Sequence, residues 1–421
     1  MAVELGSSSS DLNFKVGDSQ VQELWMGDQK VWPPSQQVLI ERFDVNVRSN
    51  GEKYTLENTL ADIDKAFVRL VGSSDGAGGG PIGDTGTEGP DTIGVAVVIT
   101  STTELTFYTA NTINKKISGE VWRYVGPVGG FYEFISRGRS KVTLTSTDKS
   151  SSTSISGVSN MNDVIPLYNG FSTNETSFTR YNGTTLGLSV SSGGTITFSR
   201  NNSNITTTID AYYEAVEFIG SGWSVGHAIS TSHSSAGTTG VVVDMNESIT
   251  GTGGSTFALS SWDHGMIMAA TMQGDSTKSE VHNCMILVEP DISTSKVNIA
   301  FADASASNDG SAFVHILGCD AMEVHRVVNT NFPEGNNTYT STSPPAGMDS
   351  SINTNKIALE WFPGSSGMNL LHPRGRLLGL IGLTPQGGEL LSNQDLRTWV
   401  ARNGDVVTTK YGYVDLSGLS V

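Results

Sequence analysis

Short runs of apolar side chains, many alternating with polar ones, recur through most of the chain. The segment VLIERFDVNV at 38–47 alternates apolar and polar positions, the period of a strand with one buried face. From residue 92 onward, runs such as TIGVAVVITS, KVTLTS and AFVHILG are rich in β-branched and aromatic residues and are separated by turn-forming residues. The pattern predicts a mostly β fold: short antiparallel strands in two or three β-sandwich, jelly-roll-like units.

The segment VQELWMGDQKVWPP at 21–34 has the pattern of two very short strands folded about Gly27, Asp28 and Gln29. Pro33-Pro34 ends the pairing, because proline has no N–H to donate. A two-stranded hairpin is marginal alone in water, so we expect this one to dock on another protein. The side chains predicted to form that docking interface are Leu24, Trp25, Met26, Val31 and Trp32.

One segment has the period of an amphipathic helix. In TLENTLADIDKAFVRL at 55–70, apolar side chains recur at spacings of three and four, and Gly72 follows as a stop signal. The stripe consists of Leu56, Leu60, Ile63, Phe67 and Leu70. It is interpreted either as a local core or as a face through which copies of the chain associate. A second short helix is predicted over 391–404, capped by Ser392 or Asn393.

A glycine-rich tract, GAGGGPIGDTGTEGPD, occupies residues 76–91. Its glycines recur in the collagen-like register, in which only glycine fits at an axis shared by three chains. The members of that register are Gly80, Gly83, Gly86 and Gly89. Three triplets are too few to hold a triple helix, and a flexible loop is the simpler interpretation. Together with the preceding stripe, the register predicts a homotrimer.

These segments predict four parts of the chain. Residues 1–36 form a docking segment, and residues 37–91 form a strand, helix and glycine-rich linker for oligomerisation. Residues 92–235 and 236–421 form a first and a second β-sandwich unit. The blocks EVWRYVG at 120 and EVHRVVN at 323 share a pattern, which indicates two related β units.

The composition excludes several classes of partner. The formal net charge is −17, whereas nucleic acids and anionic membrane surfaces attract basic proteins. No apolar run approaches the ~18 residues of a membrane span, and MAVELGSSSS lacks the apolar region of a signal peptide. Cys284 and Cys319 are too few for a disulfide framework and are expected as buried thiols. We therefore expect synthesis in a reducing cytoplasm.

No motif indicates catalysis. Three pairs of residues come closest to a metal site: His227 with His233, Asp263 with His264, and His282 with Cys284. None has a zinc spacing, and a packed histidine is the commoner case. Nucleotide-binding and nucleophile motifs are lacking. The sequence predicts no enzyme and no cofactor.

Three tryptophans lie near Gly/Ser turns and are the candidates for contact with a sugar. They are Trp223, Trp262 and Trp361. Aromatic rings stack on sugar faces, but strand tryptophans more often pack in a core.

The segment FKVGDSQVQELWMGDQKVWP resembles the N-terminal hairpin of virion proteins from tailed bacteriophages. The blocks EVWRYVGPVGGFYEFISRGR, YYEAVEFIGSGWSVGHA and LADIDKAFVRL resemble structural proteins of marine phages. The resemblance implies a virion component, present in several copies, that assembles without catalysis. It also implies assembly in the cytoplasm of the host bacterium.

The expected function is that of a tail fibre or tail appendage, anchored by its N-terminus and displaying β domains. Its partners would be other virion proteins of the tail or capsid, further copies of itself and host surface polysaccharide. One alternative is a capsid decoration or head-fibre protein. Another is a carbohydrate-binding or depolymerising tailspike, although such spikes are usually long β-helices with many short repeats, which this chain lacks.

Overall fold

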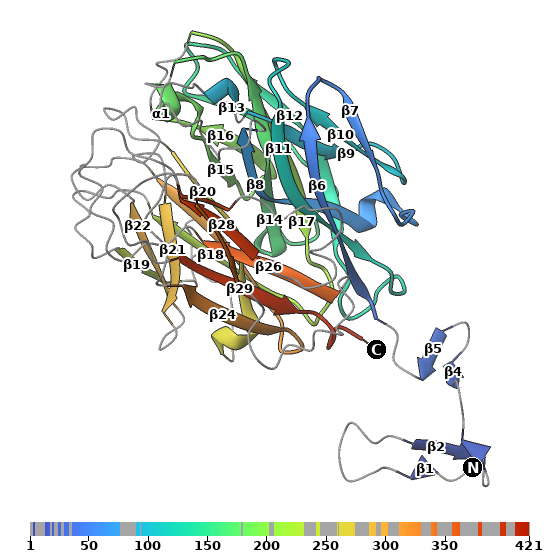
Figure 1. Ribbon diagram of the computed structural model, residues 1–421. Helices are drawn as coiled ribbons and strands as arrows, with labels where there is room; N and C mark the ends of the chain where they lie inside the picture. The colour runs from blue at the N-terminus through green and yellow to red at the C-terminus, as the bar shows by residue number, and fades with distance from the viewer. Residues whose placement is uncertain are drawn as a thin grey trace.

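The strands form six-stranded units that follow one another along the chain, as the computed structural model shows (Figure 1). The structure describes residues 3–4, 13–16, 19–20, 24–26, 29–32, 36–75, 90–92, 94–177, 180–201, 206–230, 241–244, 259, 261–273, 286–291, 296–301, 311–329, 338–342, 356–362, 378–380, 396–400 and 409–420. Within them we distinguish a first (38–124), second (135–217), third (224–318) and fourth (323–415) repeat.

All of these repeats have the same strand order. The first, sixth and third strands of a repeat pair in that order in one sheet, and the second, fifth and fourth strands pair in another. Neighbouring strands are antiparallel throughout. The chain of each repeat thus passes repeatedly from one sheet to the other, an arrangement that resembles part of a jelly roll. The predicted mostly β class is confirmed.

The first repeat consists of β6 (Val38–Val47), β7 (Glu52–Thr55), β8 (Ala66–Asp75), β9 (Ala96–Ile99), β10 (Glu104–Tyr108) and β11 (Lys115–Tyr124). The second consists of β12 (Ile135–Leu144), β13 (Ser150–Ser154), β14 (Val164–Thr173), β15 (Gly187–Val190), β16 (Thr195–Ser199) and β17 (Ile209–Glu217). The third consists of β18 (Ser224–Ser230), β19 (Val241–Asp244), β20 (Gly265–Met272), β21 (Ile286–Asp291), β22 (Lys296–Phe301) and β23 (Ala312–Gly318). The fourth consists of β24 (Glu323–Asn329), β25 (Thr338–Thr342), β26 (Ile357–Phe362), β27 (Leu378–Leu380), β28 (Leu396–Val400) and β29 (Thr409–Asp415).

Short helical turns precede or interrupt these strands. They are the 3₁₀ turns η1 (Ile63–Lys65), η2 (Pro90–Thr92), η3 (Met161–Asp163) and η5 (Trp262–His264), and the helix α1 (Tyr181–Thr184). In η1, η3 and η5 the side chain before the turn accepts a bond from a backbone N–H inside it. These capping residues are Asp62, Asn160 and Ser261, types that favour this position. The turns η1, η3 and η5 each lead directly into the third strand of their repeat.

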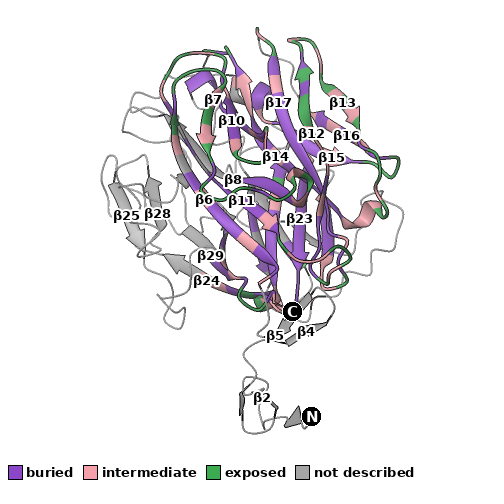
Figure 2. Cartoon of the chain, turned by 90° about the vertical axis from the view of Figure 1, so that its right-hand side faces the viewer, coloured by how far each residue is buried: buried purple, intermediate pink, exposed green. Residues whose placement is uncertain are grey.

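The burial of a strand follows its place in the sheets. β16 alternates buried and half-buried residues, as expected for a strand with one face toward a core. β17 and β23 are buried almost throughout, because each is the middle strand of its sheet and has a core on both faces. Figure 2 shows both strands in the purple of buried residues.

One apolar core is shared by all four repeats. It contains Phe67 and Trp122 of the first repeat, Leu167 of the second, Met268 of the third and Val414 of the fourth. Separate clusters fill the sandwiches of the first, second and third repeats. The repeats are therefore held together by a common interior as well as by their own cores.

The repeats close into a ring. The fourth strand of each repeat contacts the third strand of the next, through the pairs β9–β14, β15–β20, β21–β26 and, closing the circle, β27–β8. The ends of the ring also meet, since the Gln37 N–H donates to the Leu419 carbonyl at 2.8 Å. We call each junction between consecutive repeats a seam.

The N-terminal segment forms two small sheets of its own. β1 (Val3–Glu4), β2 (Asn13–Val16) and β3 (Ser19–Gln20) make one sheet, and β4 (Leu24–Met26) pairs with β5 (Gln29–Trp32) in the other. The β4–β5 pairing confirms the hairpin predicted within 21–34. Neither sheet shares a strand with the repeats, and Figure 1 draws them beyond the start of β6. The side chains of Leu24, Trp25, Met26, Val31 and Trp32 lie outside the description.

The helix predicted over 55–70 is wrong. Leu56 and Leu60 lie in an irregular segment whose N–H groups donate to the carbonyls of Thr103 and Thr102. Only η1 is helical, and β8 begins at Ala66. Leu56, Leu60, Ile63 and Leu70 pack with the core of the first repeat, and Phe67 belongs to the shared core.

The apolar stripe is thus interior rather than an oligomerisation face, because a loop and a strand fold it inward. The homotrimer proposal then rests on the register of Gly80, Gly83, Gly86 and Gly89, which lies outside the described residues.

Other predicted boundaries also differ from the sheets. The division at 91/92 falls inside the first repeat, and that at 235/236 falls between β18 and β19 of the third repeat. The helix predicted over 391–404 is wrong, since Leu396–Val400 is the strand β28. EVWRYVG lies in a sixth strand and EVHRVVN in a first strand, so their likeness does not mark equivalent positions.

Candidate functional site

The repeats can be aligned through one pairing. In each repeat the first residue of the third strand faces a position near the end of the sixth strand: Ala66 with Arg123, Val164 with Glu217, Gly265 with Gly318, and Ile357 with Asp415. The residues three positions before these sixth-strand residues are Glu120, Glu214, His315 and Gly412. Their first-strand partners are Arg42, Arg139, His227 and Arg326. Each repeat therefore places an ionisable side chain at one equivalent position of its first strand.

We call the following set the polar ladder: Arg42, Arg69 and Glu120; Arg139 and Glu214; His227 and His315; Arg326 and Glu360. It crosses the sheets formed by the first, sixth and third strands. Glu120, Glu214, His227 and Glu360 have no solvent exposure. Burying a charge without a partner is costly, so the bonds of the ladder decide what it does.

Arg139 of the second repeat binds across the first seam. It donates from Nη2 to the carbonyls of Ile63 and Ala66, at 2.6 and 2.8 Å, and from Nε to Glu214 Oε1 at 2.9 Å. Glu214 Oε2 in turn accepts the Val68 N–H of the first repeat at 3.1 Å. One ion pair therefore satisfies three backbone groups at the start of β8.

Arg326 of the fourth repeat does the same across the third seam. It donates to the carbonyls of Trp262 and Gly265, both at 2.6 Å. Its partner Glu360 lies 2.8 Å from Arg326 Nε and accepts the Ile267 N–H at 2.7 Å. Trp262, Gly265 and Ile267 stand in the third repeat where Ile63, Ala66 and Val68 stand in the first.

The second seam lacks the carboxylate, and the reason lies in the backbone. The residue equivalent to Val68 and Ile267 is Pro166, which has no N–H for a carboxylate to accept. The third repeat has His227 and His315 in the ladder, with their Nδ1 atoms 2.8 Å apart. His227 Nε2 lies 2.9 Å from the Asn162 carbonyl of the second repeat.

These contacts decide the histidine tautomers. A carbonyl only accepts, so His227 carries its proton on Nε2 and accepts with Nδ1, and His315 Nδ1 must donate. His315 Nε2 is then a bare acceptor with no hydrogen-bond partner in the part of the chain that the structure describes. Burial lowers the pKa of His227 to about 4, opposed in part by the bond to Asn162. Burial, and then the neighbouring His227, lower the pKa of His315 well below its ordinary value.

We predict that acid destabilises the second seam. The lowered folded-state pKa means that the unfolded chain binds more protons below pH ~6.5. Stability is therefore complete above that pH and falls as pH drops toward 4, by about 3 kcal/mol for His227 at 1.36 kcal/mol per pKa unit. The measurement is urea denaturation at pH 7 and pH 4.5. A His227→Gln/His315→Gln double variant is expected to lose less stability over the same interval, and an equal loss would contradict the assignment.

In the first repeat, Glu120 lies between two arginines. Arg42 Nε is 3.7 Å and Arg69 Nη1 is 3.5 Å from its oxygens, and Trp122 Nε1 donates to it at 3.1 Å. Arg69 Nε also donates to the Met268 carbonyl of the third repeat at 2.9 Å. Burial lowers the pKa of both arginines, while Glu120 raises it. The polar ladder is therefore a set of internal ties between repeats.

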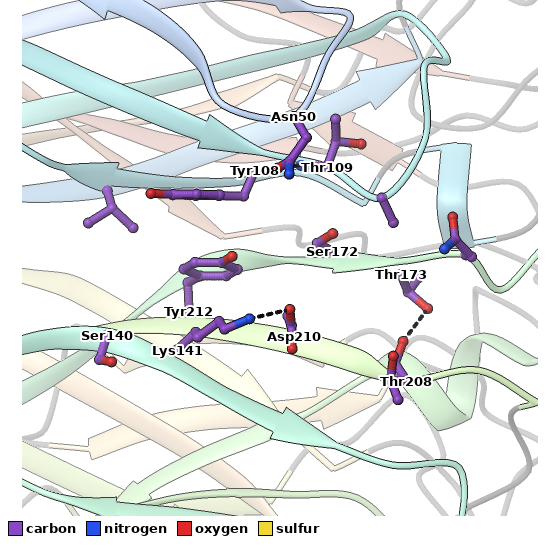
Figure 3. A pocket seen from close by; sticks show the side chains of 13 residues that line it. Asn50, Tyr108, Thr109, Ser140, Lys141, Ser172, Thr173, Thr208, Asp210 and Tyr212 are labelled. Carbon is purple, nitrogen blue, oxygen red and sulfur yellow. Dashed lines mark hydrogen bonds and ion pairs between the residues drawn. The ribbon is translucent and has the colours of Figure 1, made fainter.

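A pocket of about 650 Å³ opens at the first seam, where Gly170 of β14 pairs with Ala96 of β9. This volume lies within the range of small-molecule sites. The first repeat contributes Asn50, Val98, Tyr108, Thr109 and Ala110 to its lining. The second repeat contributes Ser140, Lys141, Ser172, Thr173, Asn174, Thr208, Asp210 and Tyr212. Figure 3 shows the two groups facing each other across the pocket.

Two tyrosines meet across this seam. The rings of Tyr108 and Tyr212 are stacked, with centroids 4.9 Å apart and planes inclined by 15°. Neither phenolic hydroxyl has a hydrogen-bond partner within the part of the chain that the structure describes. Burial raises the pKa of Tyr212, and the nearby Asp210 and Tyr108 raise it further. Its hydroxyl is therefore protonated at neutral pH and free to donate.

The charges in the pocket compensate each other. Lys141 Nζ lies 2.7 Å from Asp210 Oδ2, and Thr143 Oγ1 donates to the other oxygen of Asp210 at 2.5 Å. Two of the other lining residues, Val98 and Ala110, are apolar. Every remaining described side chain in the lining carries a hydroxyl or an amide. The pocket is thus polar and close to neutral.

The second seam shows how such a space is closed. Ser199 of the second repeat is equivalent to Tyr108 of the first repeat. Gln273 of the third repeat is equivalent to Ser172 of the second repeat. Gln273 Nε2 donates to Ser199 Oγ at 2.5 Å and so bridges the seam. Ser172 is too short to reach across the first seam in this way. The pocket therefore comes from the choice of side chains and not from the arrangement of the repeats.

An exposed apolar loop leads from the first repeat into the second. Val128 is 89% exposed, Phe131 49% and Val125 47%. The loop is held in shape, since Tyr124 Oη donates to the Pro127 carbonyl at 2.6 Å and Gly129, with φ +78°, makes a turn that favours glycine. The Val125 N–H donates to the Gln37 carbonyl, so the loop lies where the N-terminal segment enters the ring.

The tryptophans predicted to contact a sugar are not available for it where the structure describes them. Trp262 is 4% exposed and has the Arg326 guanidinium 5.5 Å over its ring, so that prediction is wrong. Trp223 packs edge-to-face against Tyr132 and Phe218 at the rim of the shared core. Trp361 lies in β26, but its side chain is outside the description. Sequence reasoning did not single out Tyr108 or Tyr212.

The histidine pairs considered for metal binding are not assembled into a site in the described residues, where no group of three potential His, Cys, Asp or Glu ligands occurs. His227 lies in the polar ladder, and His264 Nδ1 donates to the Met322 carbonyl at 2.6 Å. Cys319 is a buried free thiol, as predicted, and burial raises its pKa to about 11. His233, His282 and Cys284 lie outside the described residues.

Comparison with known proteins identifies no relative: no family model, curated protein or solved structure matches this chain. Among the described helices, none has the length and apolar character needed to cross a membrane.

Proposed function

We propose that this chain is a non-enzymatic structural component of a tailed-phage virion, a tail fibre or tail appendage anchored by its N-terminus. The observation that carries the proposal is the separation of the N-terminal sheets from the ring. β1–β5 pair only among themselves, whereas the last residues of the chain are bonded to the start of the ring at Gln36 and Gln37. In this proposal the hairpin serves as the anchor, and the ring is what the particle displays.

Two further features support an assembly role. The exposed apolar loop with Val128 and Phe131 lies beside the point where the anchor joins the ring, and exposed apolar patches commonly mark protein contacts. The buried charges of the polar ladder are engaged in ties between repeats. The resemblance of FKVGDSQVQELWMGDQKVWP to phage virion hairpins agrees with this role.

Truncation of residues 1–34 tests the anchor. The truncated chain is expected to keep its thermal midpoint within a few degrees, because Gln36 and Gln37 retain their bonds to Leu416, Leu419 and Ser420. It is also expected to be missing from purified particles, as measured by quantitative mass spectrometry. A full-length chain with Ser154→Gln, at an exposed strand position of the second repeat, serves as the comparison. If the truncated chain still enters particles, the anchor is located elsewhere.

A capsid decoration or head-fibre protein is the alternative within the same class. The copy number per particle distinguishes the two, because a tail appendage is present in few copies and a head decoration in many. The same mass-spectrometric measurement therefore decides between them.

A further inference from the structure

The lining of the pocket at the first seam contains no residue of the polar ladder. At the second seam, Gln273 bonds to Ser199 and closes the space. The aromatic side chain of Phe313 packs there against Gly187 and occupies the position that Tyr212 has at the first seam. The first seam instead keeps an open space and two phenolic hydroxyls that have no hydrogen-bond partner among the described residues. Leaving polar groups unpaired in a partly buried site is unfavourable unless water or a ligand satisfies them.

We propose that this pocket binds a neutral carbohydrate. Its lining of Ser, Thr, Asn and Tyr side chains supplies groups that both donate and accept, which matches the hydroxyls of a sugar. Tyr108 and Tyr212 add an aromatic wall with a polar edge, suited to a ligand that has both C–H faces and hydroxyls.

Charge favours a neutral ligand over an anionic one. Among the described residues that line the pocket, only Lys141 and Asp210 are charged, and they neutralise each other at 2.7 Å. The chain as a whole carries a formal net charge of −17, which repels polyanions. Uronic acid polymers and nucleotides therefore fit the pocket less well than neutral hexoses, deoxyhexoses or N-acetylhexosamines.

The repeats supply the variant that closes the pocket. Ser172→Gln introduces at the first seam the residue that stands at the equivalent position of the second, where it bridges the gap. Tyr212→Phe likewise copies Phe313 and removes one hydroxyl without removing the ring. Ser154→Gln, on an exposed strand position outside the pocket, is the matched control.

The test is binding of the full chain to an array of immobilised neutral and anionic oligosaccharides. The array covers hexoses, deoxyhexoses, N-acetylhexosamines and uronic acids. We expect binding to at least one neutral glycan, unchanged in Ser154→Gln and lost in Ser172→Gln. Tyr212→Phe should weaken it roughly three- to tenfold, the effect of one hydrogen bond. Equal thermal midpoints show that the variants are folded.

Three results would overturn the proposal: no binding to any neutral glycan, binding to anionic glycans alone, or neutral binding that survives Ser172→Gln. A role for this binding in host attachment rests on the proposed virion function. The two can fail separately. If Ser172→Gln enters particles normally and no glycan binds, the pocket assignment fails alone; if the chain is missing from particles yet binds the glycan, only the virion role fails.

Discussion

The Phe67→Ala variant is expected to lose about 3–5 kcal/mol of unfolding free energy, the usual cost of truncating a buried phenylalanine. Phe67 has no exposed surface, stacks on Trp122 with centroids 5.5 Å apart and meets Phe134 edge-on at 4.9 Å. The substitution leaves a cavity in the core that all four repeats share. Urea denaturation followed by tryptophan fluorescence measures the loss.

The same variant separates the two interpretations of the stripe at 55–70. If Phe67 is interior, its truncation lowers stability and leaves the solution mass of the folded chain unchanged. Ile113→Ala is the control, since that residue is 39% exposed and its truncation should cost little. If the Phe67→Ala chain had normal stability but a lower oligomeric mass, the result would support the interpretation of the stripe as an association face.

Arg326→Leu is expected to cost a similar amount, about 3–5 kcal/mol, because it leaves a buried carboxylate without its cation. Glu360 has no solvent exposure, and the carbonyls of Trp262 and Gly265 lose their donor. In the parent, burial raises the pKa of Glu360, and Arg326 acts against that rise. Without Arg326 this pKa should rise further.

The sign of the pH dependence follows. A carboxyl whose folded pKa lies above its unfolded value loses stability as pH rises, so the difference between Arg326→Leu and the parent should shrink toward acid pH. The double variant Arg326→Leu/Glu360→Leu should recover part of the stability, since no charge then stays buried. A deficit that is independent of pH and unrelieved in the double variant would mean that packing, not charge, is lost.

The β class was predictable because strand periodicity is local, as VLIERFDVNV shows. The helix at 55–70 was not, because Leu56 and Leu60 owe their burial to bonds with the distant Thr102 and Thr103. Five apolar residues at spacings of three and four fit a folded-in loop followed by a strand as well as they fit a helix.

The four repeats could not be recognised from the sequence, because different residue types occupy equivalent positions. Arg42, Arg139, His227 and Arg326 share one place in the fold, while their partners range from glutamate to histidine and glycine. Pro166 explains one of these changes by removing a backbone donor. Sequence likeness, as between EVWRYVG and EVHRVVN, indicated the wrong correspondence.

The polar ladder did leave a signal in the sequence. Glu214 in YYEAVEF and Glu360 in IALEWF stand within apolar runs, where an unpaired charge is not tolerated. The pocket left none, because its residues come from segments around 50, 98–110, 140, 172 and 210 that only the seam brings together. Tryptophans attracted attention instead, although large aromatic side chains in strands usually pack inward.

The proposed virion role, the central claim, is tested most directly by cross-linking mass spectrometry on virus particles purified from the source of this sequence. Lysine-reactive reagents would report on Lys15 and Lys30 in the N-terminal segment and on Lys53 and Lys141, which are exposed on the ring. We predict that the chain is present and that Lys15 or Lys30 is linked to another virion protein, while Lys53 and Lys141 are not. A particle that lacks the chain, or one that holds it through ring lysines alone, would contradict an anchored structural role.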